Sequence, residues 1–277
     1  MHSYVDYIAD PDRSCAIVAH RGAWHTAPEN SLLAIEKAIL AGYEVVEIDV
    51  RRSADGEFCL LHDDTLERMA GLDQEPEALT LQQLSRLRLR DRDGGEANPV
   101  TDEKLPGLKE VFDLARGQIF IDLDIKHVEL LPDVIACARS MGVVGQVDFK
   151  ADLRTGEDLA WIREAVEPHG APFMAKTHLE ARDADTQLDL LFKLSPFLCE
   201  IYFDRLEQLA ERKALFREAG IALWVNTLDA VSCCGFTDTA ALRDPQAIWG
   251  RLIDAGVSAI QTDEPEALRA YLSGAKA

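Results

Sequence analysis

The 277-residue sequence is poor in positive charge: 29 lysines and arginines stand against 49 aspartates and glutamates, for a formal net charge of −20. Nucleic acid and anionic bilayers would repel such a chain on average, so we expect neither as a partner. The chain also lacks any apolar run of about 18–20 residues, which a membrane helix needs, so we expect no stable membrane insertion. A local basic pocket for one small anion remains compatible with this charge.

Several motifs are absent as well. The six cysteines show no C-x-x-C spacing and no cysteine–histidine cluster, so no zinc site is indicated. The first residues, MHSYVDYIADPDRSC, have neither the basic start nor the apolar core of a secretory signal. We therefore expect a cytoplasmic protein in a reducing compartment.

Short β-branched runs alternate with amphipathic helical patterns along the chain, which predicts a parallel sheet with right-handed crossovers. Nine runs are predicted as strands: Ala16–His20, Val45–Arg51, Phe58–His62, Ile119–Lys126, Gln146–Lys150, Pro172–Lys176, Leu198–Phe203, Ile221–Asn226 and Ser258–Thr262. Five helices follow from the 3.6-residue periodicity and its stop signals: Ser31–Ala41, Leu108–Arg116, Leu159–Glu167, Leu206–Ala219 and Pro245–Ala255.

One strand breaks the alternation, because only the five residues 53–57 separate Arg52 from Phe58. A parallel crossover needs about a dozen residues, whereas Asp-Gly between two apolar runs predicts a hairpin. We therefore expect Phe58–His62 to fold back antiparallel on Val45–Arg51. Eight parallel strands remain, the number that closes a (β/α)8 TIM barrel, and we predict one catalytic domain over residues 1–277. An open doubly wound sheet is the alternative, but no glycine-rich phosphate loop favours it.

Residues 64–106 do not follow this alternation. They contain the charged and glycine-bearing stretch RLRLRDRDGGEANP. Two interpretations are open: a solvated excursion of the chain, or a small insertion after the second barrel strand that caps the barrel mouth.

Charged and apolar side chains alternate along the second predicted strand. One face carries the apolar residues Val46, Ile48 and Val50. The other face, which would point into the barrel, carries Glu47, Asp49 and Arg51. Two buried carboxylates cost on the order of several kcal/mol unless a cation compensates them. That cation is either a divalent metal or an internal partner, namely Arg51 or a lysine.

The run Ile119–Lys126 repeats the pattern, with its acidic residues and Lys126 on one face and apolar residues on the other. Asp124 is placed to complete an all-oxygen site with Glu47 and Asp49. Oxygen ligands favour Mg²⁺, Ca²⁺ or Mn²⁺ over zinc.

Two histidines are expected near these carboxylates. A turn near residue 55 places His62 almost opposite Asp49, and His20 ends the first strand, next to the second strand in a barrel. Such a pair can act as general acid and base near neutral pH. Arg21 and Lys126 can hold charge that develops on an anionic centre. The combination suits phosphoryl chemistry with an oxygen leaving group.

The motifs HRG (residues 20–22), PENS (28–31) and AGYEVVEIDVRRSADGEFCLLHDDTLERMAG (41–71) resemble the glycerophosphodiester phosphodiesterase family. The later motifs KLPGLKEVF, DLDIK, LWVNT and GVSAIQTDEPEAL continue the resemblance in order, so that it spans residues 17 to about 270. That family is a (β/α)8 barrel that hydrolyses deacylated phospholipids to glycerol 3-phosphate and an alcohol with a divalent cation.

The resemblance implies a role for each of eight residues. His20 and His62 match the acid–base pair. Contacts to phosphate or substrate are implied for Arg21, Lys126 and Trp224. Metal ligands are implied at Glu47, Asp49 and Asp124, for one Mg²⁺ or Ca²⁺ ion with Mn²⁺ as the alternative. Trp224 equally suits the core as a lone aromatic in a strand.

One departure from the family pattern keeps other functions open. The third metal ligand is usually the glutamate of an E-x-K pattern, and here it is Asp124. An Asp-x-Lys pattern is similar to sphingomyelinase D-like relatives, which act as phosphodiesterases or lyases, but these lack the HRG and PEN arrangement. The second candidate is such an enzyme acting on a sugar phosphodiester or lysophospholipid, and the third is a non-catalytic binding barrel. The oligomeric state is not predicted.

Overall fold

The computed structural model describes residues 3–180 and 182–274. Nine strands form its main sheet: β1 (Ala16–His20), β2 (Val45–Arg52), β3 (Phe58–Leu60), β6 (Phe120–Ile125), β7 (Val147–Asp152), β8 (Phe173–Leu179), β9 (Leu198–Phe203), β10 (Ala222–Asn226) and β11 (Val257–Thr262). Their order is β1-β11-β10-β9-β8-β7-β6-β2-β3, and β1 pairs with β2 as well as β11. Without β3, the strands therefore form a closed ring of eight. The predicted (β/α)8 TIM barrel is confirmed.

All nine predicted strands are present, and β1 and β9 have the predicted bounds. The chain divides into two compact units. The first unit is Ala19–Phe149, and the second holds the described residues of His2–Val18 and Lys150–Ala277. Each unit is described by itself below.

The first unit contains five helices. They are α2 (Leu32–Ala41), α3 (Glu67–Ala70), α4 (Leu81–Leu84), α5 (Leu108–Ala115) and α6 (Leu131–Ser140), with short turns at Trp24–Thr26, Pro76–Ala78, Val128–Leu130 and Val144–Gln146. Helix α2 begins and ends at the predicted polar and glycine signals. The Ser31 hydroxyl accepts a hydrogen bond from the Ala34 amide (3.1 Å) at the start of α2, and Gly42 ends it in the left-handed conformation. The predicted α2 and α5 are confirmed, whereas α6 was not predicted.

The hairpin of β2 and β3 is confirmed, with Val50 opposite Leu60 in an antiparallel register. Beyond β3, the Leu61 amide donates to the Asp49 carbonyl (3.1 Å), so Leu61 lies opposite Asp49 and His62 follows it directly. On its other side β2 pairs in parallel with β6. This pairing brings the two strands with alternating acidic residues side by side.

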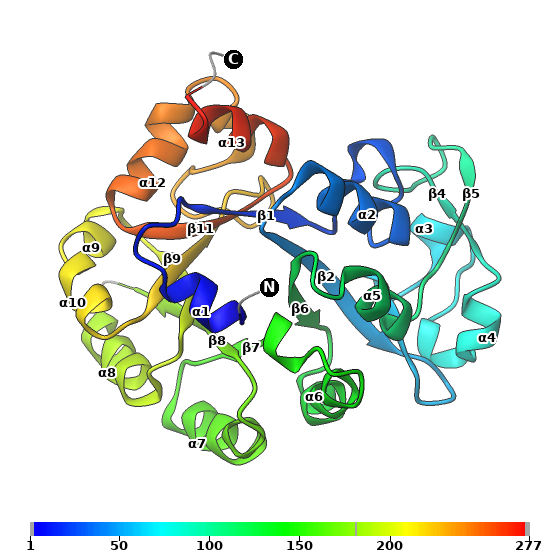
Figure 1. Cartoon of the computed structure of the whole chain (residues 1–277), viewed down its shortest axis with the longest axis horizontal. Helices are drawn as coiled ribbons and strands as arrows, with labels where there is room; N and C mark the ends of the chain where they lie inside the picture. The colour runs from blue at the N-terminus through cyan, green and yellow to red at the C-terminus, as the bar shows by residue number, and fades with distance from the viewer. Residues whose placement is uncertain (1–2, 181, 275–277) are drawn as a thin grey trace. The chain divides into compact units, whose positions relative to one another are not determined.

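Residues 64–106 form a small folded insertion rather than a solvated excursion. Besides α3 and α4 they contain an antiparallel ribbon of β4 (Arg88–Arg90) and β5 (Val100–Lys104), which the periodicity did not predict. Figure 1 shows α3, α4 and this ribbon gathered beside α2. Five of their buried side chains form a hydrophobic cluster with Cys59 and Leu61 of the β3 segment: Leu66, Met69, Leu84, Leu89 and Leu105. The solvated interpretation is therefore wrong, and the role of a cap stays a prediction.

The second unit continues the strand–helix alternation. Its helices are α1 (Tyr4–Ala9), α7 (Gly156–Ala165), α8 (Ala184–Leu194), α9 (Glu207–Ala210), α10 (Lys213–Glu218), α11 (Asp238–Ala241), a π-helix (Gln246–Gly250), α12 (Arg251–Asp254) and α13 (Pro265–Leu272), with a short turn at Glu167–His169. Helix α8 packs on β8, α10 on β10 and α12 on β11. The single helix predicted over Leu206–Ala219 is two, α9 and α10. Among the described helices of the chain, none combines the length and apolarity needed to span a membrane.

Gly22, which follows His20 and Arg21, supplies a testable constraint on the first unit. Its φ is +87°, and an added Cβ would lie 2.8 Å from both the carbonyl carbon and Cβ of Ala34 in α2. We predict that Gly22→Ala lowers the free energy of unfolding by about 2–5 kcal/mol, from left-handed backbone strain and overpacking together. Urea denaturation measures this loss.

Gly117→Ala is the matched control, because Gly117 has a φ of +71° with no atom within 4 Å of the added Cβ. We expect it to cost about 1–2 kcal/mol, from the backbone term alone. Equal losses in the two variants would contradict the close approach of Gly22 to α2.

Candidate active site

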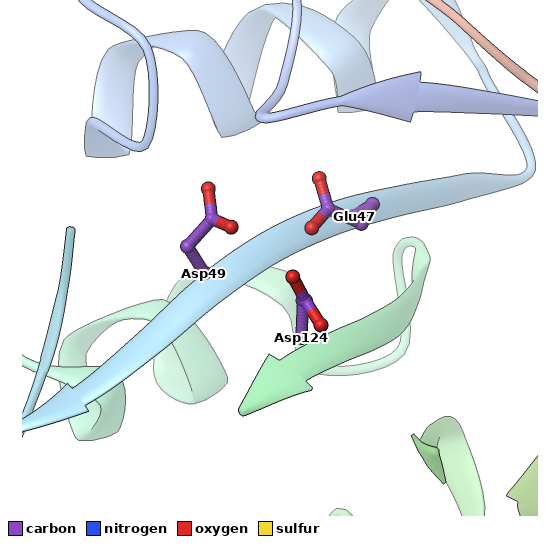
Figure 2. A group of neighbouring side chains, drawn as sticks. All are labelled: Glu47, Asp49 and Asp124. Carbon is purple, nitrogen blue, oxygen red and sulfur yellow. The ribbon is translucent and has the colours of Figure 1, made fainter. Parts of the chain in front are cut away.

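Three carboxylates meet where β2 and β6 run in parallel. The register pairs Asp49 with Asp124, and Glu47 lies two residues before Asp49 on the same face of β2. One oxygen from each of these three side chains lies within 4.8 Å of the other two. Figure 2 shows Glu47 and Asp49 on β2 and Asp124 on the neighbouring strand β6. The structure therefore brings the three predicted metal ligands together.

These carboxylates are shielded to different degrees. Glu47 and Asp49 are 2% and 1% exposed, as buried as the apolar side chains beside them on β2, whereas the side chain of Asp124 is 29% exposed. Burial without compensation would disfavour the ionised forms. The cluster therefore needs cations close by, and its open side is the side of Asp124.

Lys126 is one of these cations. Its Nζ lies 2.6 Å from Asp49 Oδ1 and 2.7 Å from Asp124 Oδ2. Although burial by itself lowers the pKa of the lysine, the two carboxylates outweigh it and raise that pKa above its ordinary value. Of the two internal partners that the sequence left open for the β2 carboxylates, the lysine is the one that pairs with Asp49.

Arg21 is a second cation at the cluster. Its Nε lies 3.2 Å from Asp49 Oδ2, and its backbone amide donates to Glu47 Oε2 (3.1 Å). Burial alone would raise the pKa of Asp49, but Lys126 and Arg21 outweigh it and hold that pKa below its usual value. Asp49 is therefore ionised at neutral pH.

The loop before α2 adds a neutral partner that the sequence analysis did not assign to the site. Asn30 Nδ2 donates to Asp49 Oδ2 (2.7 Å), and the Asp49 amide donates to Asn30 Oδ1 (3.1 Å). The φ of Asn30 is +56°, in the left-handed region that asparagine tolerates better than most residues. The PEN motif directly before a helix was the available signal for this residue.

His20 lies at the end of β1, with its Nε2 3.9 Å from Glu47 Oε2. That separation is an electrostatic contact and is too long for a hydrogen bond. The position fits the predicted place of the ring beside the β2 carboxylates.

His62 lies beyond β3 with 40% of its side chain exposed. Its Nδ1 is 2.8 Å from Asp63 Oδ1, and it contributes to the lowered pKa of Asp49, after Lys126 and Arg21. Asp63 was not predicted as a site residue, although its place directly after the histidine was a signal. When the Asp63 carboxylate accepts a hydrogen bond from Nδ1–H, Nε2 is left as the nitrogen that can exchange protons.

Arg51, on the same face of β2 as Glu47 and Asp49, has partners in the insertion. Its Nε donates to Glu77 Oε1 (3.0 Å), and its NH1 donates to Asp64 Oδ1 (2.9 Å) and the Asp63 carbonyl (2.7 Å). The interpretation of Arg51 as a counterion to the β2 carboxylates is therefore wrong, because longer-range partners occupy its guanidinium.

Trp224, predicted to contact substrate, belongs to the second unit. It is fully buried, and its indole Nε1 donates to Asn226 Oδ1 (2.7 Å). Asn226 Nδ2 in turn donates to Glu200 Oε1 (3.0 Å), which also accepts from the Tyr202 hydroxyl (2.5 Å). The indole nitrogen therefore holds Asn226 against a buried carboxylate, and a contact of Trp224 with substrate stays a prediction.

Two lysines of the second unit lie near the same carboxylate. Lys150 Nζ is 3.7 Å from Glu200 Oε2, and Lys176 Nζ is 4.0 Å from Glu200 Oε1. Both distances are those of ion pairs without a short hydrogen bond.

Two family models match separate parts of the chain. Residues 20–148 match the glycerophosphoryl diester phosphodiesterase family. Residues 173–272 match a domain of unknown function. The first match ends well before residue 270, to which the sequence motifs had extended the resemblance.

Curated relatives match the first half of the chain. Glycerophosphodiester phosphodiesterase 1 of Mus musculus is 35% identical over 131 residues, which are 44% of this chain and 38% of the relative. Glycerophosphodiester phosphodiesterase of Caldanaerobacter subterraneus is 30% identical over 120 residues, 43% of this chain and 48% of the relative. The chain thus matches less than half of the length of either protein.

Solved structures match over nearly the whole length. A glycerophosphodiester phosphodiesterase from Thermotoga maritima matches with a TM-score of 0.69 and 25% sequence identity. The match covers 94% of this chain and 99% of the Thermotoga chain. A glycerophosphoryl diester phosphodiesterase from Parabacteroides distasonis has a TM-score of 0.74 and 22% identity, covering 99% and 93%. The latter likeness supports the barrel fold alone.

Asp63 generates a prediction about pH. Burial alone would raise its pKa, but the hydrogen bonds from His62 and Arg68 outweigh burial and hold the pKa below its ordinary value. Its stabilising contribution is therefore complete above the ordinary aspartate pKa of about 3.9 and is lost as the pH falls toward the lower folded value. We expect the difference in free energy of unfolding between wild type and Asp63→Asn to shrink below about pH 4.

Urea denaturation of both proteins across that range measures the difference. A difference that grows on acidification would contradict the assignment.

The site motifs and both comparisons by sequence converge on one part of the chain. His20, Arg21, Glu47, Asp49, His62, Asp124 and Lys126 all lie within the 20–148 match. The predicted acid–base, phosphate and metal residues therefore lie in the part of the chain that resembles the glycerophosphodiester phosphodiesterase family.

Proposed function

We propose that the protein hydrolyses glycerophosphodiesters to glycerol 3-phosphate and an alcohol, with a divalent cation and histidine acid–base catalysis. The observation that carries the proposal is the meeting of Glu47, Asp49 and Asp124 within 4.8 Å, beside Arg21 and Lys126. An anionic substrate and a hard cation both suit that arrangement. The curated relatives named above carry the same activity in their names.

The proposed cation site consists of oxygen ligands only. Glu47, Asp49 and Asp124 would hold one Mg²⁺ or Ca²⁺ ion, with Mn²⁺ as the alternative, because hard cations prefer carboxylate oxygens. When bound, such an ion polarises a phosphoryl oxygen as a Lewis acid. Lys126 already contacts two of these carboxylates, so it would share Asp49 and Asp124 with the ion.

Side chains of the protein would bind the phosphate and transfer the protons. Arg21 and Lys126 bind the anionic phosphate and hold the charge that grows on its oxygens. One histidine takes a proton from the nucleophile, and the other gives a proton to the oxygen of the departing alcohol. The nucleophile is water or, through a cyclic phosphate, the neighbouring glycerol hydroxyl. For His62, the contact of Nδ1 with Asp63 leaves Nε2 as the nitrogen that exchanges the proton.

A structural neighbour supports the product class. The phosphodiesterase of Oleispira antarctica, with 21% identity and a TM-score of 0.68, has been solved in complex with sn-glycerol 3-phosphate. The barrel of that protein therefore binds the product that we propose here.

The second candidate is a related phosphodiesterase or lyase that acts on a sugar phosphodiester or lysophospholipid. It is favoured by the Asp-x-Lys pattern at Asp124. We place the reaction in the cytoplasm, because all six cysteines are free thiols, including the exposed Cys234.

The activity and its metal requirement are tested together. We expect glycerophosphocholine and glycerophosphoethanolamine to yield glycerol 3-phosphate, to lose turnover in EDTA, and to regain it with Mg²⁺, Ca²⁺ or Mn²⁺. A coupled assay for glycerol 3-phosphate measures the product. No product with any of the three metals would reject the glycerophosphodiesterase proposal, and a cyclic phosphate as the sole product would favour the lyase.

The histidines are tested separately from the metal. We expect His20→Ala and His62→Ala each to lower kcat by about 10²–10⁴-fold, the usual contribution of a general acid or base. His169→Ala is the control, because this histidine lies in the second unit, outside the proposed machinery. Wild-type rates in both His20→Ala and His62→Ala would rule out the acid–base mechanism.

A further inference from the structure

One arginine of the 64–106 insertion contacts two carboxylates of the site. Arg68 Nε donates to Asp63 Oδ2 (2.6 Å), and its NH2 donates to Asp63 Oδ1 (2.9 Å) and to Glu29 Oε1 (2.6 Å). The planar guanidinium is therefore bidentate on one carboxylate and bonded to a second. Glu29 is 3% exposed and Arg68 is 29% exposed, so the carboxylate of this pair is buried and the arginine is partly exposed.

Each of these carboxylates also holds a residue of the proposed machinery. Asp63 Oδ1 lies 2.8 Å from His62 Nδ1. Glu29 Oε1 and Oε2 both accept from Arg21 NH1 at 3.0 Å. The contacts run without a gap from His62 through Asp63, Arg68 and Glu29 to Arg21.

We propose that Arg68 is a positioning residue, which orients the His62 ring through Asp63 and the Arg21 guanidinium through Glu29. The proposal rests on the proposed function for its effect on turnover. Without Arg68, the Asp63 carboxylate is free to rotate about its side-chain torsions, and His62 loses the constraint on its ring. A bidentate arginine removes that freedom because its donors lie in a rigid plane.

The insertion holds Arg68 itself by several contacts. Its NH1 donates to the Asp93 carbonyl, and its own carbonyl accepts from the Gly95 amide (2.7 Å). An added Cβ at Gly94 would lie 2.6 Å from that carbonyl oxygen, so the turn approaches Arg68 closely. Arg92, in the same turn, accepts a hydrogen bond from the Glu29 amide through its carbonyl (2.8 Å).

The same turn therefore fixes the arginine and one of its two carboxylate partners. This arrangement gives the insertion a specific task at the site. It supplies the side chain that joins the residue after His62 to the loop before α2.

The ionisation states of Arg68 and Asp63 favour a stable ion pair between them. Burial by itself would lower the pKa of Arg68, but Asp63 and Glu29 outweigh it and raise that pKa. The pKa of Asp63 is held low, as described above. Both partners are therefore ionised at neutral pH, and the bidentate pair persists where the enzyme would work.

The test compares Arg68→Gln and Arg68→Lys with Arg88→Gln. Arg88 is the matched control because it lies in the same insertion and pairs with the exposed Asp102. We expect Arg68→Gln to lower kcat by about 10–10²-fold, the size of effect that a small misplacement of a catalytic group produces. Arg68→Lys should show an intermediate loss, since an ammonium lacks the planar fork, and Arg88→Gln should match wild type.

A second readout does not depend on turnover. The ¹⁵N shifts of the His62 ring report which nitrogen carries the proton, and we expect the wild-type neutral ring to be protonated mainly at Nδ1. Arg68→Gln should lower the Nδ1-protonated fraction, Arg68→Lys should lower it less, and Arg88→Gln should leave it unchanged. A purely structural role in the insertion would lower thermal stability without this change.

Wild-type tautomer and kcat in a folded Arg68→Gln protein would overturn the proposal. If that variant does not fold, Arg68→Lys replaces it, and wild-type values there overturn the proposal equally. If wild type hydrolyses no diester, the proposed function fails, and the ring tautomer alone still decides whether Arg68 orients His62.

Discussion

The burial of two carboxylates on one strand is the constraint on which the first unit depends. Glu47 and Asp49 are almost inaccessible to solvent, and neither is tolerated there without compensation. Lys126, Arg21 and Asn30 approach Asp49 from three other segments of the chain and supply charge or hydrogen bonds. The parallel β2–β6 register and the loop before α2 matter because they deliver these partners. The same compensation leaves a cluster of carboxylates with two cations beside it, which suits a phosphodiester and a hard metal ion.

The insertion after β3 extends this network outward. Glu77 engages Arg51, which would otherwise stand beside the buried carboxylates, and Arg68 ties Asp63 to Glu29. Its hydrophobic cluster makes these contacts possible, because a solvated segment would not hold charged side chains in one geometry. Through Arg68 and Glu77, the insertion thus supports the proposed machinery, although neither residue is proposed to touch the reacting atoms.

The two halves of the chain differ in how much their residues indicate about function. The first half carries the match to the glycerophosphodiester phosphodiesterase family. Of the eight predicted site residues, it holds every one except Trp224. The second half matches a domain of unknown function and holds a buried glutamate, Glu200, among two lysines, a tyrosine and Asn226. The alcohol selected by the proposed reaction is the property that the first half leaves undetermined.

The sequence by itself determined the nine main strands, the β2–β3 hairpin and the acidic face of β2, because periodicity and turn chemistry are local. It also located the residues of the family motifs. Only the tertiary structure decided that Lys126, and not Arg51, pairs with Asp49. It also decided that residues 64–106 pack around a hydrophobic cluster. It alone revealed that Arg68 lies between Asp63 and Glu29. Arg68 and Glu29 are 39 residues apart in the chain, so no periodic pattern in the sequence predicts their contact. Such contacts depend on strand register, loop path and rotamer, which a pattern along the chain does not encode.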